Sequence, residues 1–232
     1  MVTLKSLRAV ALVLFLSATA HFSDATAQTP FPHLTLDFGA GYSSASPEQF
    51  NSSIGTQRGK LGNGLALSGG LRLQVSEHFS MLAKVGYLGS ASMTTIAVTD
   101  ENGPQPLALL HDEYRIRSVP VLLGLGYSLS VGKTLLRADL AGEYHFASVT
   151  YDMPAIPARG FDPIHAEARN NGIGFSVAAG PEWRVLPELS VGGKLGYRWA
   201  NIGDFGYEVY TLRKYDLDLS GFFADAGFRI HP

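Results

Sequence analysis

The chain has 232 residues, of which 46% are hydrophobic and only 16% are charged, with 26 glycines and no cysteine. The charged fraction lies below the roughly 25% that is usual in soluble domains. The formal net charge of −2 provides no basic surface for nucleic acid, so we expect no nucleic-acid partner. Without cysteine we expect neither a disulfide framework nor a lipid-modified N-terminus.

The N-terminal segment has the pattern of a secretory signal peptide. Lys5 and Arg8 precede an apolar core, residues 9–16, which is too short to cross a bilayer as a helix. Two small-residue cleavage sites follow, ending at Ala20 and Ala27, and we prefer the second because it leaves a polar start to the mature chain. The alternative is a buried helix of a cytosolic protein. The predicted division is therefore a signal peptide over residues 1–27 and one domain over residues 28–232.

Beyond residue 30, apolar residues alternate with small or polar ones, which is the period of a β-strand with two different faces. The pattern recurs eight times, over residues 33–42, 64–75, 79–88, 114–127, 136–146, 173–184, 189–199 and 217–230. Tyr114 and Ile116 are out of phase with Val119, which predicts a bulge near Arg117–Ser118. The last run is predicted to change phase near Gly221.

The connections between these runs alternate between long and short. Segments 43–63, 90–111, 148–170 and 201–215 are predicted as long loops, and segments 76–78, 130–133 and 186–188 as tight turns. An even number of strands with all long loops on one side is the arrangement of bacterial outer-membrane barrels. The predicted fold is all-β, an eight-stranded antiparallel up-and-down transmembrane β-barrel in the outer membrane.

Aromatic residues lie near the strand ends on the apolar face, as in the two girdles that flank the lipid-facing band of such barrels. They are Tyr42, Phe79, Tyr87, Tyr127, Tyr144, Phe146, Trp183, Tyr197 and Trp199. The alternative is a soluble sandwich or lipocalin-like barrel with these rings in its core. Sorting of the loops by length favours the membrane barrel, because a soluble barrel has no reason for it.

The opposite faces of the strands are rich in Gly, Ala and Ser and carry charges of both signs. Eight strands leave an interior only wide enough for side chains. We therefore expect a paired, hydrogen-bonded network that fills the lumen. Its predicted members are Asp37, Arg72, Lys84, Arg137, Asp139, Glu143, Glu182, Arg184, Lys194 and Arg198, with Asp225 and Arg229 on the same faces.

Three stretches resemble the small outer-membrane β-barrel domain proteins, a broad group that includes OmpA-like and OmpX-like eight-stranded barrels and porin-family small barrels. Arg115–Tyr127 resembles the fourth strand of that group, Ala179–Arg184 the sixth and Leu217–Phe223 the eighth. The resemblance covers the mature chain and implies outer-membrane lipid and the barrel-assembly machinery as partners. The family's last strand usually ends in an aromatic residue, whereas Phe228 here is followed by four further residues, which puts assembly efficiency in doubt.

Motifs for small-molecule chemistry are weak in this sequence. Gly132-Lys133-Thr134 lacks the first glycine and the following helix of a phosphate-binding loop, and the histidines have no zinc spacing. We predict no cofactor and no metal site. A lipid-modifying hydrolase would need a hydroxyl, a base and a carboxylate. The candidates are His78 with Ser80, and His145 with Glu143 and Ser148.

The sequence predicts a non-enzymatic barrel with a structural or surface-interaction role, long extracellular loops and a filled lumen. An outer-membrane lipid hydrolase and a narrow small-molecule conduit stay open as alternatives. The loop segments contain no recognisable binding motif, so their partner is not predicted.

Overall fold

The computed structural model describes residues 32–45, 63–99, 106–155, 162–205 and 215–232, which belong to one compact unit beginning at Pro32. The predicted signal peptide lies outside these ranges. Within them the regular structure is β-strand, and they contain no helix long and apolar enough to cross a membrane. The strands are β1 (His33–Ser44), β2 (Asn63–Gln74), β3 (Phe79–Thr99), β4 (Pro106–Val131), β5 (Thr134–Met153), β6 (Ile164–Leu186), β7 (Leu189–Phe205), β8 (Tyr215–Asp218) and β9 (Gly221–Ile230).

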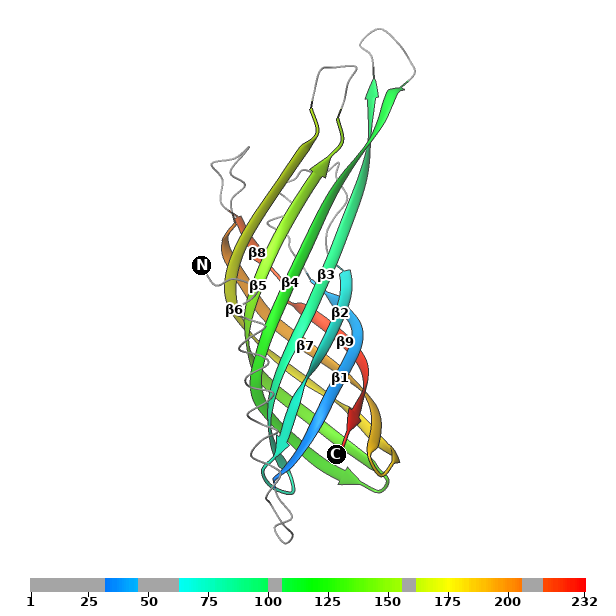
Figure 1. The fold of residues 1–232 in the computed structure, drawn as a ribbon, viewed down its shortest axis with the longest axis vertical. Coiled ribbons are helices and arrows are strands. Elements are labelled where there is room, and N and C mark those ends of the chain that lie inside the picture. Colours follow the sequence, from blue (N-terminus) through cyan, green and yellow to red (C-terminus); the bar gives the residue numbers. More distant parts are fainter. Residues whose placement is uncertain (1–31, 46–62, 100–105, 156–161, 206–214) are drawn as a thin grey trace. The chain divides into compact units, whose positions relative to one another are not determined.

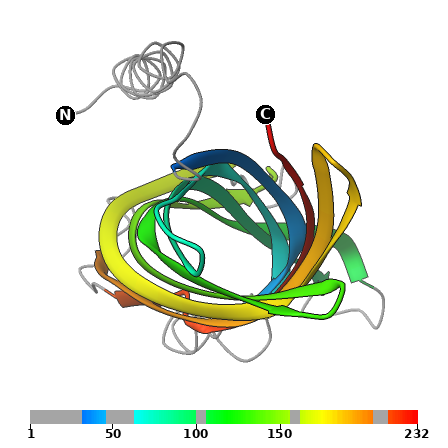
Figure 2. The same ribbon diagram turned by 90° about the horizontal axis from the view of Figure 1, so that it is seen from below.

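The strands form a closed antiparallel ring (Figures 1 and 2). Neighbours along the chain pair from β1 to β7, β7 pairs with β9, and β9 closes the ring on β1. The short β8 extends β9 along β7, so the two together act as the eighth strand. Following the register once around the ring from His33 returns to β1 at Ser43, a shift of ten residues that reflects the tilt of the strands.

Closure leaves no strand edge unpaired around the ring, as a lipid environment requires. The apolar faces point outward: Leu123 and Leu195, both mid-strand, are 66% and 72% exposed. A soluble barrel would bury these residues in its core. The aromatic residues cluster on the same outer surface, where Phe175 stacks on Trp199 with ring centroids 4.6 Å apart and Phe79 packs edge-on against Tyr127.

The short turns lie where they were predicted, but three of the four long connections contain more strand than predicted. β3 continues to Thr99 and β4 begins at Pro106, although segment 90–111 was expected to be a loop. Residues 148–153, 164–170 and 201–205 are likewise strand. Figure 1 shows the β3–β4 and β5–β6 hairpins extending beyond the rest of the ring. The predicted runs ended where the apolar alternation weakened, whereas backbone pairing continues beyond the lipid-facing band.

The predicted bulge near Arg117–Ser118 and the phase change near Gly221 are both wrong. β4 pairs with β5 in one register from Glu113 to Val131. On β7, the register is the same from Leu217 to Ile230 and shifts only further out, between Ile202 and Phe205. Tyr114 and Ile116 point into the barrel. The sequence pattern shifts because the interior becomes apolar at this end, so an apolar side chain there no longer marks the lipid-facing side.

The turn between β4 and β5 explains the Gly132-Lys133-Thr134 motif. Only two residues connect the strands, and Gly132 has a φ of 61°. Two-residue hairpins favour glycine at such a position, because a left-handed backbone costs it little. The motif is therefore a hairpin turn.

Candidate functional site: the charged lumen

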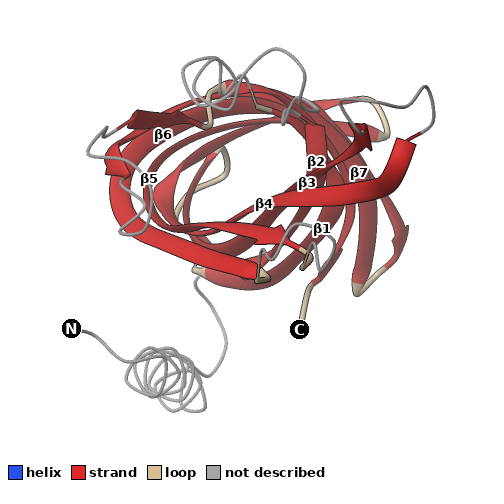
Figure 3. Ribbon diagram, turned by 90° about the horizontal axis from the view of Figure 1, so that it is seen from above, coloured by secondary structure: helices blue, strands red, loops and turns tan. Residues whose placement is uncertain are grey.

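Figure 3 shows the ring of strands from above. The inward faces of these strands bring charged side chains together. Nine of the ten predicted lumen charges lie there, buried or half-buried: Asp37, Arg72, Lys84, Arg137, Asp139, Glu143, Glu182, Lys194 and Arg198. Arg184 is the exception, because it is exposed next to the β6–β7 turn and lies outside the network. Asp225 and Arg229 of β9 join the network. We call these eleven inward residues the lumen charge network.

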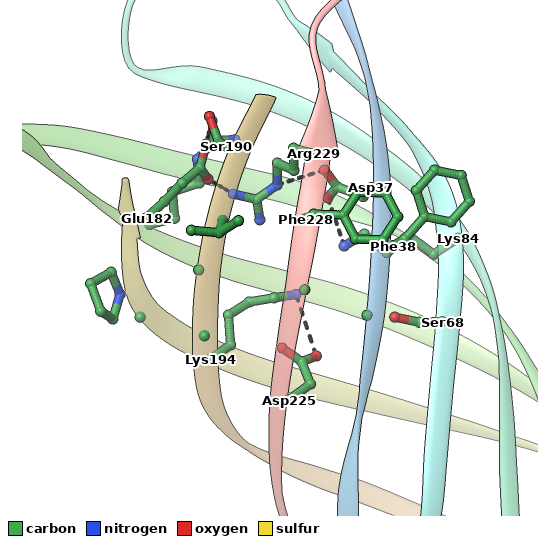
Figure 4. A pocket seen from close by; sticks show the side chains of 18 residues that line it. Asp37, Phe38, Ser68, Lys84, Glu182, Ser190, Lys194, Asp225, Phe228 and Arg229 are labelled. Carbon is green, nitrogen blue, oxygen red and sulfur yellow. Dashed lines mark hydrogen bonds and ion pairs between the residues drawn. The ribbon is translucent and has the colours of Figure 1, made fainter. Parts of the chain in front are cut away.

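Asp37 of β1 is the centre of one part of this network (Figure 4). Its Oδ1 accepts a hydrogen bond from Arg229 Nε at 2.6 Å, and its Oδ2 lies 2.8 Å from Lys84 Nζ and 3.4 Å from Arg72 Nε. Three cations from three other strands thus neutralise one buried carboxylate. A charge buried in this way is stabilised only while its partners stay in place.

Arg72 of β2 connects Asp37 to the opposite wall. Its Nη2 donates to both oxygens of Asp139, at 2.8 and 2.9 Å, and its Nη1 donates to Ser80 Oγ at 2.8 Å. Lys194 Nζ lies 3.5 Å from Asp139 and 3.7 Å from Asp225. The Arg72 side chain is 1% exposed, so its guanidinium is satisfied almost entirely by protein.

Glu182 of β6 forms the second part of the network, towards the short-turn end. Its carboxylate pairs with Arg137 Nε at 2.7 Å and is also in contact with Arg229 Nη1. Arg229 therefore connects Glu182 to Asp37, as Figure 4 shows. The result is a continuous set of charge contacts across the lumen.

Glu143 of β5 forms a separate group nearer the long hairpins. Its Oε2 accepts a hydrogen bond from Arg198 Nε at 2.7 Å and lies 2.9 Å from His145 Nε2. His145 Nδ1 in turn lies 3.1 Å from Ser118 Oγ. Ser118 and His145 are both fully buried. The sequence pointed to Ser148 as the hydroxyl, but Ser148 is on the opposite face of β5, because an odd separation from His145 reverses the side.

Above the Glu143 group the interior becomes apolar. A cluster of buried side chains closes this end of the ring: Tyr114, Ile116, Ala147, Val149, Ala168, Ala200, Ile202, Phe205, Leu217 and Leu219. Val149, Ile202 and Leu217 have no exposed surface. This layer was not predicted, because every apolar strand face was expected to contact lipid.

The residues of the other hydrolase candidate, His78 and Ser80, do not lie together in the structure. His78 is exposed at the β2–β3 turn and its Nδ1 contacts the carbonyl of Ser128 at 3.1 Å. Ser80 lies inside the lumen and accepts from Arg72. The two side chains therefore do not form a nucleophile and base.

The chemistry of the lumen is mutual neutralisation of charge. Six cations face five carboxylates, and the side chains leave only small spaces between them, with cavities of about 30 and 70 Å³. A buried water needs two to four polar partners, which such spaces provide.

Comparison with known proteins agrees with this architecture. The outer membrane protein beta-barrel domain family matches residues 9–229. The chain belongs to this family. It is therefore an outer-membrane protein, and its lipid-facing band and closed ring are the family's architecture. No curated protein sequence matches the chain.

Solved structures resemble the chain at low sequence identity. A major outer membrane protein from Thermus thermophilus is 12% identical, with a TM-score of 0.50 over 86% of this chain and 99% of that one. Neisserial surface protein A is 13% identical over 87% and 97%, with a TM-score of 0.46. The outer membrane protease OmpT from Escherichia coli is 11% identical over 90% and 99%, with a TM-score of 0.45. At such identities the likeness concerns the fold alone.

Proposed function

We propose that this protein is a closed, non-enzymatic barrel that holds its extended hairpins at the cell surface for structural or interaction roles. The observation that carries the proposal is the filled lumen. Its charges are paired across the ring, and an apolar cluster lies beyond them. An open pore would instead require a continuous hydrated path.

The length of the hairpins supports a surface role. A strand needs about 9–11 residues to cross a bilayer, whereas β4 has 26 and β6 has 23. The additional residues of β3–β6 form paired sheet on the side of the long connections, which is extracellular in such barrels. On β5 and β6 the described outward residues of this part include Thr150, Glu167 and Arg169, which are polar, as expected of a surface that meets an external partner.

Planar-bilayer recording tests the closed lumen. We expect purified protein to give no steady conductance at neutral pH. A large, stable conductance from folded protein would overturn the proposal and favour the conduit. Heat-dependent migration on electrophoresis, recorded on the same sample, establishes that the inserted protein is folded.

A lipid hydrolase is the second candidate, because Ser118, His145 and Glu143 lie in contact in that order. Hydrolysis would need the serine to reach a substrate carbonyl, and here both Ser118 and His145 are fully buried. We expect no ester hydrolysis by the wild-type protein in lipid A or phospholipid micelles. Hydrolysis that Ser118→Ala abolishes would establish the enzyme instead.

A further inference from the structure

The outer face of β4, β5 and β6 changes from apolar to charged within two register rows. The row that ends the lipid-facing band contains Val119, Phe146 and the exposed Asn171. The next row outward contains Arg117, Ser148 and Arg169. Arg117 and Arg169 are exposed. Because Phe146 packs against Tyr144 in the aromatic girdle, the two arginines lie where lipid headgroups begin.

The charges on this face are arranged in layers. The row nearest the membrane has two arginines and a serine. The next row places Arg115 and Glu167 across Thr150, and the third places Glu113 and Asp152 beside His165. Positive charge is therefore concentrated against the membrane and negative charge away from it. This is the polarity that would attract a phosphate at headgroup level.

Both arginines have donors left for a ligand. Within the described ranges Arg117 makes no hydrogen bond or close ion pair, although its charge acts at longer range on Glu113 and Glu167. Arg169 donates through Nε and Nη2 to Glu167, both at 2.8 Å, which orients the guanidinium and leaves Nη1 without a described partner. The same contact lowers the pKa of Glu167, so the pair persists at neutral pH. Arg117 on β4 and Arg169 on β6 are two strand spacings apart, roughly 10 Å, so their long side chains can both reach one anionic group between them.

A groove of about 220 Å³ lies beside Arg117 on the same outer surface. It is lined by Arg115 and Arg117 of β4, by Tyr87 and Gly89 of β3 and by Leu65 of β2. Gly89 has no side chain where the Tyr87 ring lies, so the tyrosine folds over it along the strand. The groove is thus cationic at one end and apolar at the other, where Leu65 is 53% exposed.

We propose that Arg117, Ser148 and Arg169 bind a phosphate of lipid A, with part of the lipid lying in the groove beside Tyr87 and Leu65. Arginine binds phosphate through parallel hydrogen bonds, and the serine hydroxyl adds a donor between the two guanidinium groups. The extracellular position of the row selects the outer leaflet, whose anionic lipid is this phosphorylated glycolipid. The inference goes beyond the proposed function, because it does not depend on whether the lumen conducts.

Native mass spectrometry of the purified full-length protein in micelles tests the site. Wild type is expected to retain lipid A and to bind the fully dephosphorylated glycolipid at least tenfold more weakly. The Arg117→Gln/Arg169→Gln variant should lose about tenfold or more in lipid A affinity, since each surface arginine contributes roughly a factor of five. Ser148→Ala should lose less. These residues lie outside the lipid-facing band, so folding is expected to be unaffected, as heat-dependent migration would verify.

The matched control is Lys133→Gln, which removes an exposed cation from the opposite, short-turn end of the barrel. It should bind lipid A as wild type does. Equal lipid A affinity in wild type and the double arginine variant would overturn the proposal. An equal loss of phosphatidylglycerol binding in that variant would overturn the assignment to lipid A, because it would indicate general anion attraction.

Discussion

At the scale of single residues, Arg72 occupies the space that a side chain at position 126 would need. A Cβ on Gly126 would overlap Arg72 Nη1 and come within 2.6 Å of Ser80 Oγ. Gly126→Ala is therefore expected to break the Arg72–Ser80 hydrogen bond and lower the free energy of unfolding by ~1–3 kcal/mol. Urea titration followed by tryptophan fluorescence measures this change.

Gly142→Ala is the matched control for that substitution. Gly142 faces outward on β5, and its nearest neighbour for a Cβ is the Leu123 carbonyl oxygen at 3.9 Å. Its unfolding midpoint should stay close to wild type. Equal midpoints for the two alanine variants would mean that Arg72 can move aside without cost.

Glu143 and Arg198 provide the second test at this scale, because each is buried and they neutralise one another. Among the described residues, Glu143→Ala leaves the Arg198 guanidinium with Ser43 Oγ at 3.4 Å and the Phe223 ring, and should cost about 3–5 kcal/mol of unfolding free energy. Adding Arg198→Met should recover part of this loss. A double variant less stable than Glu143→Ala alone would show that the arginine stabilises the barrel by packing.

Alternation in the sequence predicts which charges point inward, but not which of them meet. Asp37 and Arg229 are separated by 192 residues and meet only because β9 closes on β1 in a particular register. That register depends on the tilt of the whole ring, which no local pattern encodes. His145 and Ser118 likewise meet through the β4–β5 register.

At the scale of the strand, prediction succeeds where one face contacts lipid and fails where it does not. Leu36, Phe38 and Ala40 alternate with Thr35 and Asp37 because lipid and lumen select opposite chemistry. Near Tyr114 and Leu217 the interior is apolar and the exterior polar, so the same pattern reverses its meaning. The predicted bulge at Arg117–Ser118 came from that reversal.

If the outer face of β4 contacts lipid, the stability cost of a charged substitution there should depend on its depth in the membrane. Leu123→Arg places a charge at mid-strand and should lower the free energy of unfolding in lipid by ~2–4 kcal/mol. Val131→Arg, also exposed but next to the β4–β5 turn, should cost ~0–1 kcal/mol because the side chain reaches the interface. Urea titrations in phospholipid vesicles provide both values. Equal costs at the two positions would remove the support for a band centred near Leu123.

At the scale of the whole molecule, the lumen has three barriers in sequence along the barrel. The Asp37 and Glu182 contacts lie nearest the short turns, the Glu143–Arg198 pair comes next, and the apolar cluster lies towards the long hairpins. They share strands, since β5 contributes Arg137, Glu143 and Val149, but their side chains occupy different levels of the lumen. The loss of one layer therefore leaves side chains of the other two across the same path.

This redundancy predicts that no single layer controls conduction. The Glu143→Ala/Arg198→Ala variant removes both partners of the middle ion pair and so leaves no unpaired charge there. The Ile202→Ala/Leu217→Ala variant removes side-chain volume from the apolar layer. Both variants should stay silent in planar bilayers, because Arg72 and Asp139 still connect opposite walls below them. Steady conductance from either folded double variant would mean that one layer alone seals the barrel. Conductance from the Ile202→Ala/Leu217→Ala variant only would place that seal in the apolar cluster, with the charges below it already hydrated.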